Sequence, residues 1–400
     1  MSFLGAACAA RACQSRLSRI LVTVMLVIVV VLAGLSLSCG KSSYTATAAS
    51  QNAYVTLPAS GSVLQLHING ATGTITMGAQ TPVTENTSPT GLALLPSKKF
   101  LYAINSRANT ISIFNVASDG TLTLSGAPVP AGGSSPNAAV IDPTGSYLLV
   151  TNNLTDDVSV FSIDAGSGAL TPVAGSPFPA HTNPTEILIT PSGKFVYVTN
   201  PNIGAITAFA FSSSDGTLTP LPGSPFSSLA GGGGGAFGLA VDGSERFLYV
   251  TNPSASNPPP NVSTVGNISG FNIDPNTGAL TPILGSPFTA TNGIGPSAIT
   301  VDPAGKFVYA TTTGSSSSIW CFAITPTTGQ LVAVTNSPFS LAAGGLFALI
   351  DPKGNFLYIG TQVGNGISGY TYSASTGAPT VIVGSPFSTG KAPGKMVLSQ

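Results

Sequence analysis

Side chains that could carry out chemistry are few in this chain, and three of them are candidates for a polar site. Charged residues make up 6% of the 400 residues, and there are two histidines. The candidates are Glu186, Lys395 and His181. A carboxylate held near a cation can orient a polar ligand or act as a general base, and a histidine in a loop can do the same. The alternative interpretation is that these side chains are simply solvated.

The other histidine and the cysteines do not indicate a metal or a cofactor. His67 falls in the alternating strand pattern of residues 63–68 and is interpreted as structural. Zinc and haem sites need clustered thiolates or histidines, so no metal and no cofactor are expected. Cys321 lies in the apolar run 319–324. It is interpreted as a buried, inert thiol rather than a nucleophile.

An internal repeat must position the candidate residues. The run Lys194-Phe-Val-Tyr-Val-Thr-Asn200 has counterparts throughout the chain, and a truncated copy begins at Ala53. Seven units of one supersecondary type are therefore present. Their aligned positions are Tyr54, Tyr102, Leu149, Tyr197, Tyr249, Tyr309 and Tyr358.

Each unit is expected to form four short strands. Turns of the form Asp-Pro-x-Gly, such as 142–145 and 302–305, join the first strand to the second. A run of Gly-Ser-Pro-Phe ends the fourth strand at 175–178, 223–226, 285–288 and 384–387, with a variant at 336–339, and its Phe is interpreted as a packing anchor between units. No segment of the repeats has helical periodicity. The sequence therefore predicts an all-β, seven-bladed β-propeller with four-stranded antiparallel blades.

The two ends of the repeat region predict how the ring closes. The chain enters at Ala53 on a second strand and leaves at 394–398 on a first strand, so the C-terminal strand should pair with the N-terminal repeat. If first strands are innermost, their second residues line the channel. By alignment these are Lys395, Gly91, Ala138, Glu186, Gly238, Ala298 and Phe347. Glu186 and Lys395 stand out, three blades apart and roughly across the channel.

These repeats resemble the Tyr-Val-Thr-Asn repeat propellers, which include the seven-bladed lactonase family typified by 6-phosphogluconolactonase. The motifs are Tyr197-Val-Thr-Asn200, Tyr249-Val-Thr-Asn252, Leu149-Val-Thr-Asn152 and the Asp-Pro-x-Gly turns, over about residues 53–400. The resemblance implies polar and charged side chains around the channel mouth. Where the family has a histidine before one such turn, this chain has Pro184-Thr-Glu186.

The N-terminus has the layout of an export signal. Residues 1–19 contain three arginines and no acid, an apolar run follows over 20–37, and the run Leu35-Ser-Leu-Ser-Cys39 resembles a lipoprotein cleavage site. Cys39 is the expected lipidation site, with an uncleaved membrane helix or a plain cleaved signal as alternatives. The predicted division is signal and anchor 1–39, linker 40–52 and propeller 53–400. All three alternatives place the propeller outside the cytoplasm, in the periplasm or on the cell surface.

Charge and loops bear on the expected partners. The three basic residues of the signal leave 10 basic against 13 acidic groups, a net charge of 10 − 13 = −3, so no nucleic-acid partner is expected. Blade five carries a glycine run, Gly231 to Gly235, and an insert from Pro253 to Gly266 that includes Pro258. Loops inserted on one face of a propeller often form its binding face, although disordered decoration is the alternative.

Two functions stay open from the sequence. The first is a monomeric, membrane-tethered, non-catalytic binding module for a glycan, peptide or protein. It rests on the shortage of charged and histidine side chains where the chemistry of the family would need them. The second is a lactonase-like hydrolase that binds a sugar lactone at the channel mouth, with Glu186 or His181 activating water.

Overall fold

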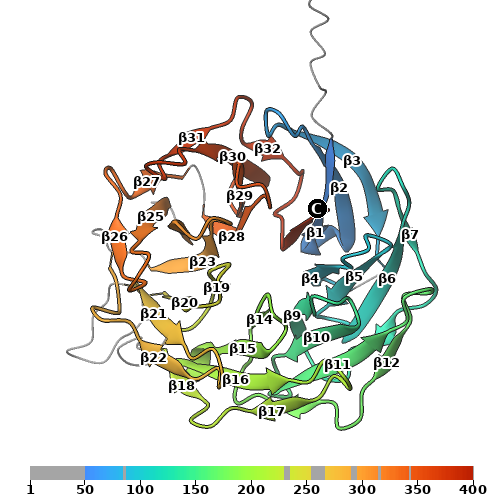
Figure 1. Ribbon diagram of the computed structural model, residues 1–400. Helices are drawn as coiled ribbons and strands as arrows, with labels where there is room; N and C mark the ends of the chain where they lie inside the picture. The colour runs from blue at the N-terminus through green and yellow to red at the C-terminus, as the bar shows by residue number, and fades with distance from the viewer. Residues whose placement is uncertain are drawn as a thin grey trace, which may run out of the picture. The chain divides into compact units, whose positions relative to one another are not determined.

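The computed structural model describes residues 50–83, 87–228, 235–253, 266–289, 295–313, 317–341 and 344–399. The predicted signal, Cys39 and most of the linker lie outside the described residues. In the part of the chain that is described, no helix is long and apolar enough to cross a membrane. Residues 49–400 form one compact unit. This unit is a ring of seven sheets (Figure 1).

Each sheet is an antiparallel blade whose first strand is innermost, which confirms the predicted fold class. In six blades the strand order follows the chain outward from the channel, and in the closing blade the innermost strand comes from the C-terminal end. The innermost strands are β33 (Met396–Leu398), β4 (Pro89–Leu94), β9 (Pro136–Ile141), β14 (Ile187–Ile189), β19 (Leu239–Val241), β23 (Pro296–Val301) and β28 (Gly345–Ile350). The second strands are β1 (Gln51–Leu57), β5 (Phe100–Asn105), β10 (Tyr147–Asn152), β15 (Phe195–Asn200), β20 (Phe247–Asn252), β24 (Phe307–Thr312) and β29 (Phe356–Thr361).

The outer half of each blade is a third strand followed by a short outer strand. The third strands are β2 (Ser62–Ile68), β6 (Thr110–Val116), β11 (Asp157–Ile163), β16 (Ala205–Phe211), β21 (Asn267–Ile273), β25 (Ser318–Ile324) and β30 (Gly366–Tyr372). The outer strands are β3 (Ile75–Pro82), β7 (Leu122–Leu124), β12 (Leu170–Pro172), β17 (Leu218–Pro220), β22 (Leu280–Pro282), β26 (Leu331–Ala333) and β31 (Pro379–Val381). Two short 3-10 turns, η1 (Pro58–Ser60) and η2 (Pro201–Ile203), follow second strands.

The ring closes as predicted, through the C-terminal strand. β33 pairs antiparallel with β1, with Tyr54 opposite Val397, and the strand order of this blade is β3-β2-β1-β33. Three strands of one blade thus come from the N-terminal end of the ring and one from the C-terminal end. Because β1 begins at Gln51, the ring starts two residues earlier than the predicted boundary at 53.

The repeated turn residues hold the hairpins in place. The buried Asp142 carboxylate accepts the backbone N–H groups of Ser146 and Tyr147, both at 2.7 Å, and Gly145 has a φ of +75°. A left-handed residue at this point of the turn is best supplied by glycine. Asp302 and Asp351 make the same contacts, so the aspartates of these turns are structural.

The Gly-Ser-Pro-Phe runs return each outer strand to its own blade. Their serine hydroxyl accepts a backbone N–H of the third strand, as Ser176 does from Val160 at 2.9 Å. The Phe then pairs back onto that strand, as Phe178 does opposite Val158, and packs against the apolar core shared with the next blade. The two-residue strands formed in this way are β13 (Phe178–Pro179), β18 (Phe226–Ser227), β32 (Phe387–Ser388) and, from the variant Asn-Ser-Pro-Phe, β27 (Phe339–Ser340). In blade 2 the run Gly126-Ala-Pro-Val129 pairs back in the same way and forms β8 (Val129–Pro130).

The hydrophobic core lies between the blades rather than within them. Seven clusters of buried side chains each combine residues of two neighbouring blades. Across six of the seven interfaces the second-strand tyrosine donates its hydroxyl to a glycine carbonyl in the turn before the outer strand of the next blade. The pairs are Tyr54–Gly120, Tyr102–Gly168, Tyr197–Gly278, Tyr249–Gly329, Tyr309–Gly377 and Tyr358–Gly73, at 2.7–3.0 Å. The third blade has Leu149 at this position.

Deleting residues 393–400 should destabilise the whole ring. The deletion removes β33 and leaves β1 as an unpaired inner edge, so both neighbouring interfaces lose packing. Thermal unfolding should remain a single transition with a clearly lower midpoint, whereas removal of Gln400 alone should leave the midpoint unchanged. A midpoint equal to that of the intact chain would show that the ring does not depend on this strand.

The tyrosine links predict a loss of stability at alkaline pH. Burial, aided by the Asp119 carboxylate, raises the pKa of Tyr54 to about 12 from its ordinary value of 10.0, and burial raises the pKa of the other five linked tyrosines too. Their contribution is complete below pH 10 and is lost above it, because the unfolded chain then releases protons that the folded chain retains. Above pH 10, each tyrosine should lower the free energy of unfolding by up to about 1.4 kcal/mol per pH unit. Urea unfolding at pH 9 and pH 11 measures this, and equal stabilities would contradict it.

Candidate functional site

The candidate site lies on the central channel, where the first strands begin. Glu186 precedes β14 in blade 4, and Lys395 precedes β33 in blade 1. The Glu186 backbone N–H donates to the Thr199 hydroxyl at 3.0 Å, and the Lys395 backbone N–H donates to the Thr56 hydroxyl at 2.8 Å. In both blades the threonine replaces a backbone acceptor at the point where the strand starts. The second strands therefore fix the backbone from which both charged side chains project.

The two charged side chains meet across the channel. The Lys395 Nζ atom lies 2.8 Å from Glu186 Oε2 and 3.0 Å from Oε1, so the ammonium group bridges both carboxylate oxygens. The side chains remain 37% and 30% exposed, respectively. Among the residues that the structure describes, this is the only pair of oppositely charged side chains in salt-bridge contact. An accessible carboxylate held beside an ammonium group can bind a polar ligand and exchange protons with it.

Two cavities flank this ion pair. One, of about 220 Å³, is lined on its polar side by Thr90 and Asn137. The other, of about 180 Å³, is walled mainly by apolar side chains such as Phe237. Glu186, Lys395 and Leu346 line both. All seven positions aligned from the sequence, Lys395, Gly91, Ala138, Glu186, Gly238, Ala298 and Phe347, line one cavity or the other.

The other candidate bases lie away from the ion pair. His181 is exposed, has a φ of +58°, and its Nδ1 atom lies 3.2 Å from the hydroxyl of Thr207 on the third strand β16. It lines neither cavity, and the same is true of the exposed Lys391. His67 contacts the Asn52 side chain at 2.9 Å on β2, far from the channel in the strand order. The geometry thus favours Glu186 over His181 as a base.

The loops of blade five are described only at their edges. Gly231 and Pro258 lie outside the described residues, whereas Gly235, Pro253 and Gly266 lie within them. At Gly266 a Cβ atom would stand 2.0 Å from the Cα atom of Gly295, so the ends of two loops approach closely there. That these loops form a binding face stays a prediction.

Cys321 and the acidic residues have structural surroundings. Cys321 is fully buried, and burial raises the pKa of its thiol to about 12, which suppresses the nucleophilic thiolate. Among the described residues, no group of three or more His, Cys, Asp or Glu side chains could hold a metal ion.

Sequence reasoning missed the residues that support the charged pair. Thr56 and Thr199 are fully buried, and Thr199 also donates to the Phe237 carbonyl of the next blade at 3.0 Å. A signal for this role existed, because threonine recurs as the third residue of Tyr-Val-Thr-Asn although the strand around it is apolar. Leu346, whose side chain lines both cavities, follows no such pattern.

The fold and the channel residues define a seven-bladed β-propeller with an accessible ion pair in its central channel. The family model for the seven-bladed β-propeller lactonases matches residues 44–177, 173–284 and 264–392. The chain therefore belongs to the seven-bladed β-propeller lactonase family.

Solved structures share the fold at low sequence identity. A Bacteroides uniformis protein provisionally named a 6-phosphogluconolactonase superposes with a TM-score of 0.72 and 20% identity, covering 87% of this chain and 99% of the other. A protein of Bacteroides fragilis with the same provisional name superposes with a TM-score of 0.73 and 20% identity, covering 90% of this chain and 100% of the other. The periplasmic gluconolactonase of Pseudomonas aeruginosa superposes with a TM-score of 0.71 and 17% identity, covering 88% of this chain and 99% of the other. No curated protein matches the chain by sequence.

The ion pair should contribute little to folding. Pairs that retain about a third of their exposure are screened by water and typically stabilise by less than about 1 kcal/mol. A double-mutant cycle with Glu186→Gln and Lys395→Met, measured by urea unfolding, should give a coupling energy within that limit. A coupling of several kcal/mol would mark the pair as a structural brace instead.

Proposed function

We propose that this protein hydrolyses a lactone at its channel, with Glu186 as the general base. The observation that carries the proposal is the accessible Glu186–Lys395 pair between two channel cavities, at 2.8 Å, in a chain of the lactonase family. Family membership supports this function better than the non-catalytic binding module, the other function left open by the sequence.

The chemistry needs one water molecule and no further reactant. Glu186 would take a proton from a water molecule as the oxygen of that water attacks the lactone carbonyl carbon. Lys395 would stabilise the negative charge that develops on the carbonyl oxygen. The bond between the carbonyl carbon and the ring oxygen then breaks, and the proton passes to the ring oxygen as it leaves. The product is an open-chain hydroxy acid.

The cavity dimensions and charges support a small, uncharged sugar lactone. The cavity of about 220 Å³ next to Glu186 suits a single ring, and Thr90 and Asn137 offer polar contacts to ring hydroxyls. Lys395 is the only cation among the described residues that line either cavity, and in the proposed hydrolysis it would stabilise the carbonyl oxygen. A phosphate would lack a partner there, so we propose an unphosphorylated substrate. The relatives named as gluconolactonase and 6-phosphogluconolactonase agree with a sugar lactone.

The proposed location is outside the cytoplasm. The support is the export-signal pattern of residues 1–39 and the likeness to a periplasmic gluconolactonase. Lipidation at Cys39 would hold the propeller at a membrane surface, with an uncleaved helix or a plain cleaved signal as alternatives.

Glu186→Gln should abolish turnover without unfolding the chain. A general base typically contributes about 10²- to 10⁴-fold in rate. The rate of glucono-δ-lactone hydrolysis by the full chain, followed by acid release and corrected for spontaneous hydrolysis, should fall at least about 100-fold.

Glu245→Gln is the matched control for this assay. Glu245 lies in the turn between β19 and β20 and accepts the Ser192 hydroxyl at 2.7 Å, away from both channel cavities. Its removal should leave the rate unchanged. Full activity in Glu186→Gln would rule out this carboxylate as the base, and no turnover by the wild-type chain on any sugar lactone would rule out the proposed function.

A further inference from the structure

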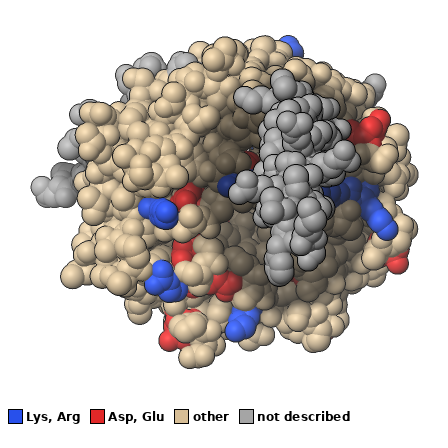
Figure 2. All heavy atoms as spheres, turned by 45° about the horizontal axis from the view of Figure 1, so that its top comes forward, with Lys and Arg blue, Asp and Glu red and all other residues tan. Residues whose placement is uncertain are grey.

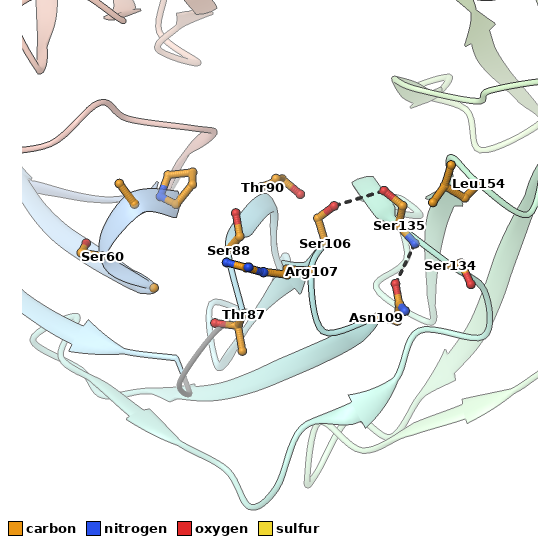
Figure 3. A pocket seen from close by; sticks show the side chains of 13 residues that line it. Ser60, Thr87, Ser88, Thr90, Ser106, Arg107, Asn109, Ser134, Ser135 and Leu154 are labelled. Carbon is orange, nitrogen blue, oxygen red and sulfur yellow. Dashed lines mark hydrogen bonds between the residues drawn. The ribbon is translucent and has the colours of Figure 1, made fainter.

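A third and larger cavity opens over blades 1 to 3, beside the channel. Its volume is about 970 Å³. It is formed by the loops between second and third strands and by the loops that lead into first strands (Figure 3). Its described lining residues are Pro58, Ala59, Ser60, Gly61, Thr87, Ser88, Thr90, Ser106, Arg107, Asn109, Ser134, Ser135 and Leu154.

We propose that this cavity, the groove, binds an acidic saccharide whose carboxylate is held by Arg107. Seven of the described lining residues carry hydroxyl groups, Asn109 adds an amide, and Arg107 is the only charged one among them. Hydroxyl and amide groups can both donate to and accept from sugar hydroxyls. A guanidinium group binds a carboxylate through two parallel hydrogen bonds.

Arg107 is not required by the propeller, which points to a role in binding. It lies in a four-residue loop between a second and a third strand, and the same loop length recurs in four other blades. The last residue of each loop is left-handed: Gly61, Asn109, Asp156, Gly204 and Asn365, with φ between 50° and 60°. At the position of Arg107 these loops carry Ala59, Leu154, Asn202 and Val363. A residue that the repeat needed would recur, as the tyrosines do.

The guanidinium group is available to a ligand. Arg107 is exposed, and its backbone N–H donates to the Thr87 carbonyl at 3.2 Å. Within the part of the chain that the structure describes, its side chain has no ion pair. In Figure 3 this side chain points toward the loop that carries Ser60, across the groove. The loop therefore holds the backbone of Arg107 in place and leaves the charge exposed.

Two contacts link the loops that line the groove. The Ser135 backbone N–H donates to the Asn109 side chain at 2.7 Å, and the Ser135 hydroxyl lies 3.4 Å from that of Ser106 (Figure 3). Ser88 and Ser135 have φ values of +48° and +52°, a conformation that costs energy for residues other than glycine. Asn183, at the equivalent position of blade 4 and outside the groove, has a φ of +59°, so this conformation belongs to the repeat and fixes the course of the loops that line the groove.

The lining favours a saccharide over other polymers. A peptide usually needs several apolar or aromatic anchors in a protein groove, and Leu154 is the only large apolar side chain among the described lining residues. Its 73% exposure, together with Pro58, offers an apolar surface to the C–H face of a sugar ring. A nucleic acid needs many cations, and the charged side chains on the face in Figure 2 stand in small groups of both signs.

The groove adjoins the channel site but does not depend on its function. Pro58 and Thr90 line both the groove and the channel cavity that contains Glu186. A ligand of two or three sugar rings in the groove would thus end near the ion pair. Binding in the groove requires no lactone hydrolysis, so the two proposals can fail separately.

Calorimetric titration of the full chain with trigalacturonate tests the proposal. Binding should be measurable, and neutral cellotriose should bind at least about tenfold more weakly because it lacks the charge-assisted hydrogen bonds to Arg107. Arg107→Gln should weaken trigalacturonate binding about 10- to 100-fold. Arg246→Gln is the matched control, since Arg246 lies in the turn between β19 and β20 and outside the groove, and it should leave the affinity unchanged.

A second variant separates the cavity from the charge. Ser106→Trp should fill the groove while keeping Arg107, and it should reduce binding of trigalacturonate as much as Arg107→Gln does. Unchanged affinity in both variants would overturn the proposal. So would equal affinity for acetate, which would show an exposed cation only, or tighter binding of triglutamate, which would show a peptide site.

Discussion

The structure depends on one repeated hydrogen bond, from a tyrosine hydroxyl in one blade to a glycine carbonyl in the next. Six of the seven blade interfaces contain it, at 2.7–3.0 Å. The tyrosine ring fills the apolar core between the blades, and its hydroxyl satisfies a buried carbonyl group that would otherwise lose its contact with water. Each bond links two neighbouring sheets beside their shared apolar core, and at the seventh interface Leu149 belongs to that core.

Repeated residues hold the ring, and residues that break the repeat form the candidate sites. Most of the aligned channel positions carry glycine or alanine. Two others carry Glu186 and Lys395, whose charged groups meet at 2.8 Å. Lys395 reaches its place only because the last strand returns to pair with β1. Arg107 lies at a loop position whose residue differs in every blade that has this loop length. Departures from a repeat therefore mark function more clearly than the shared residues, which serve packing.

The fold could be predicted from the sequence because every blade poses the same burial problem and solves it with the same residues. Seven units, the closing strand and the channel positions followed from the recurrence of Tyr197 and the Asp-Pro-x-Gly turns. The contact between Glu186 and Lys395 could not be predicted, because alignment gives a shared height along the channel but not the channel width. The outward position of His181 depends on a left-handed loop backbone. The groove needs loops of three blades at once, which no single repeat reveals.

The central claim is that the tyrosine-to-glycine bonds hold the blades together, and paired phenylalanine variants test it most directly. Tyr249→Phe removes the hydrogen bond to the Gly329 carbonyl and keeps the aromatic side chain. Tyr147→Phe removes a hydroxyl that has no hydrogen bond among the described residues. Urea unfolding should show a loss of about 1–2 kcal/mol for Tyr249→Phe and little change for Tyr147→Phe. Equal stability of the two variants would contradict the account.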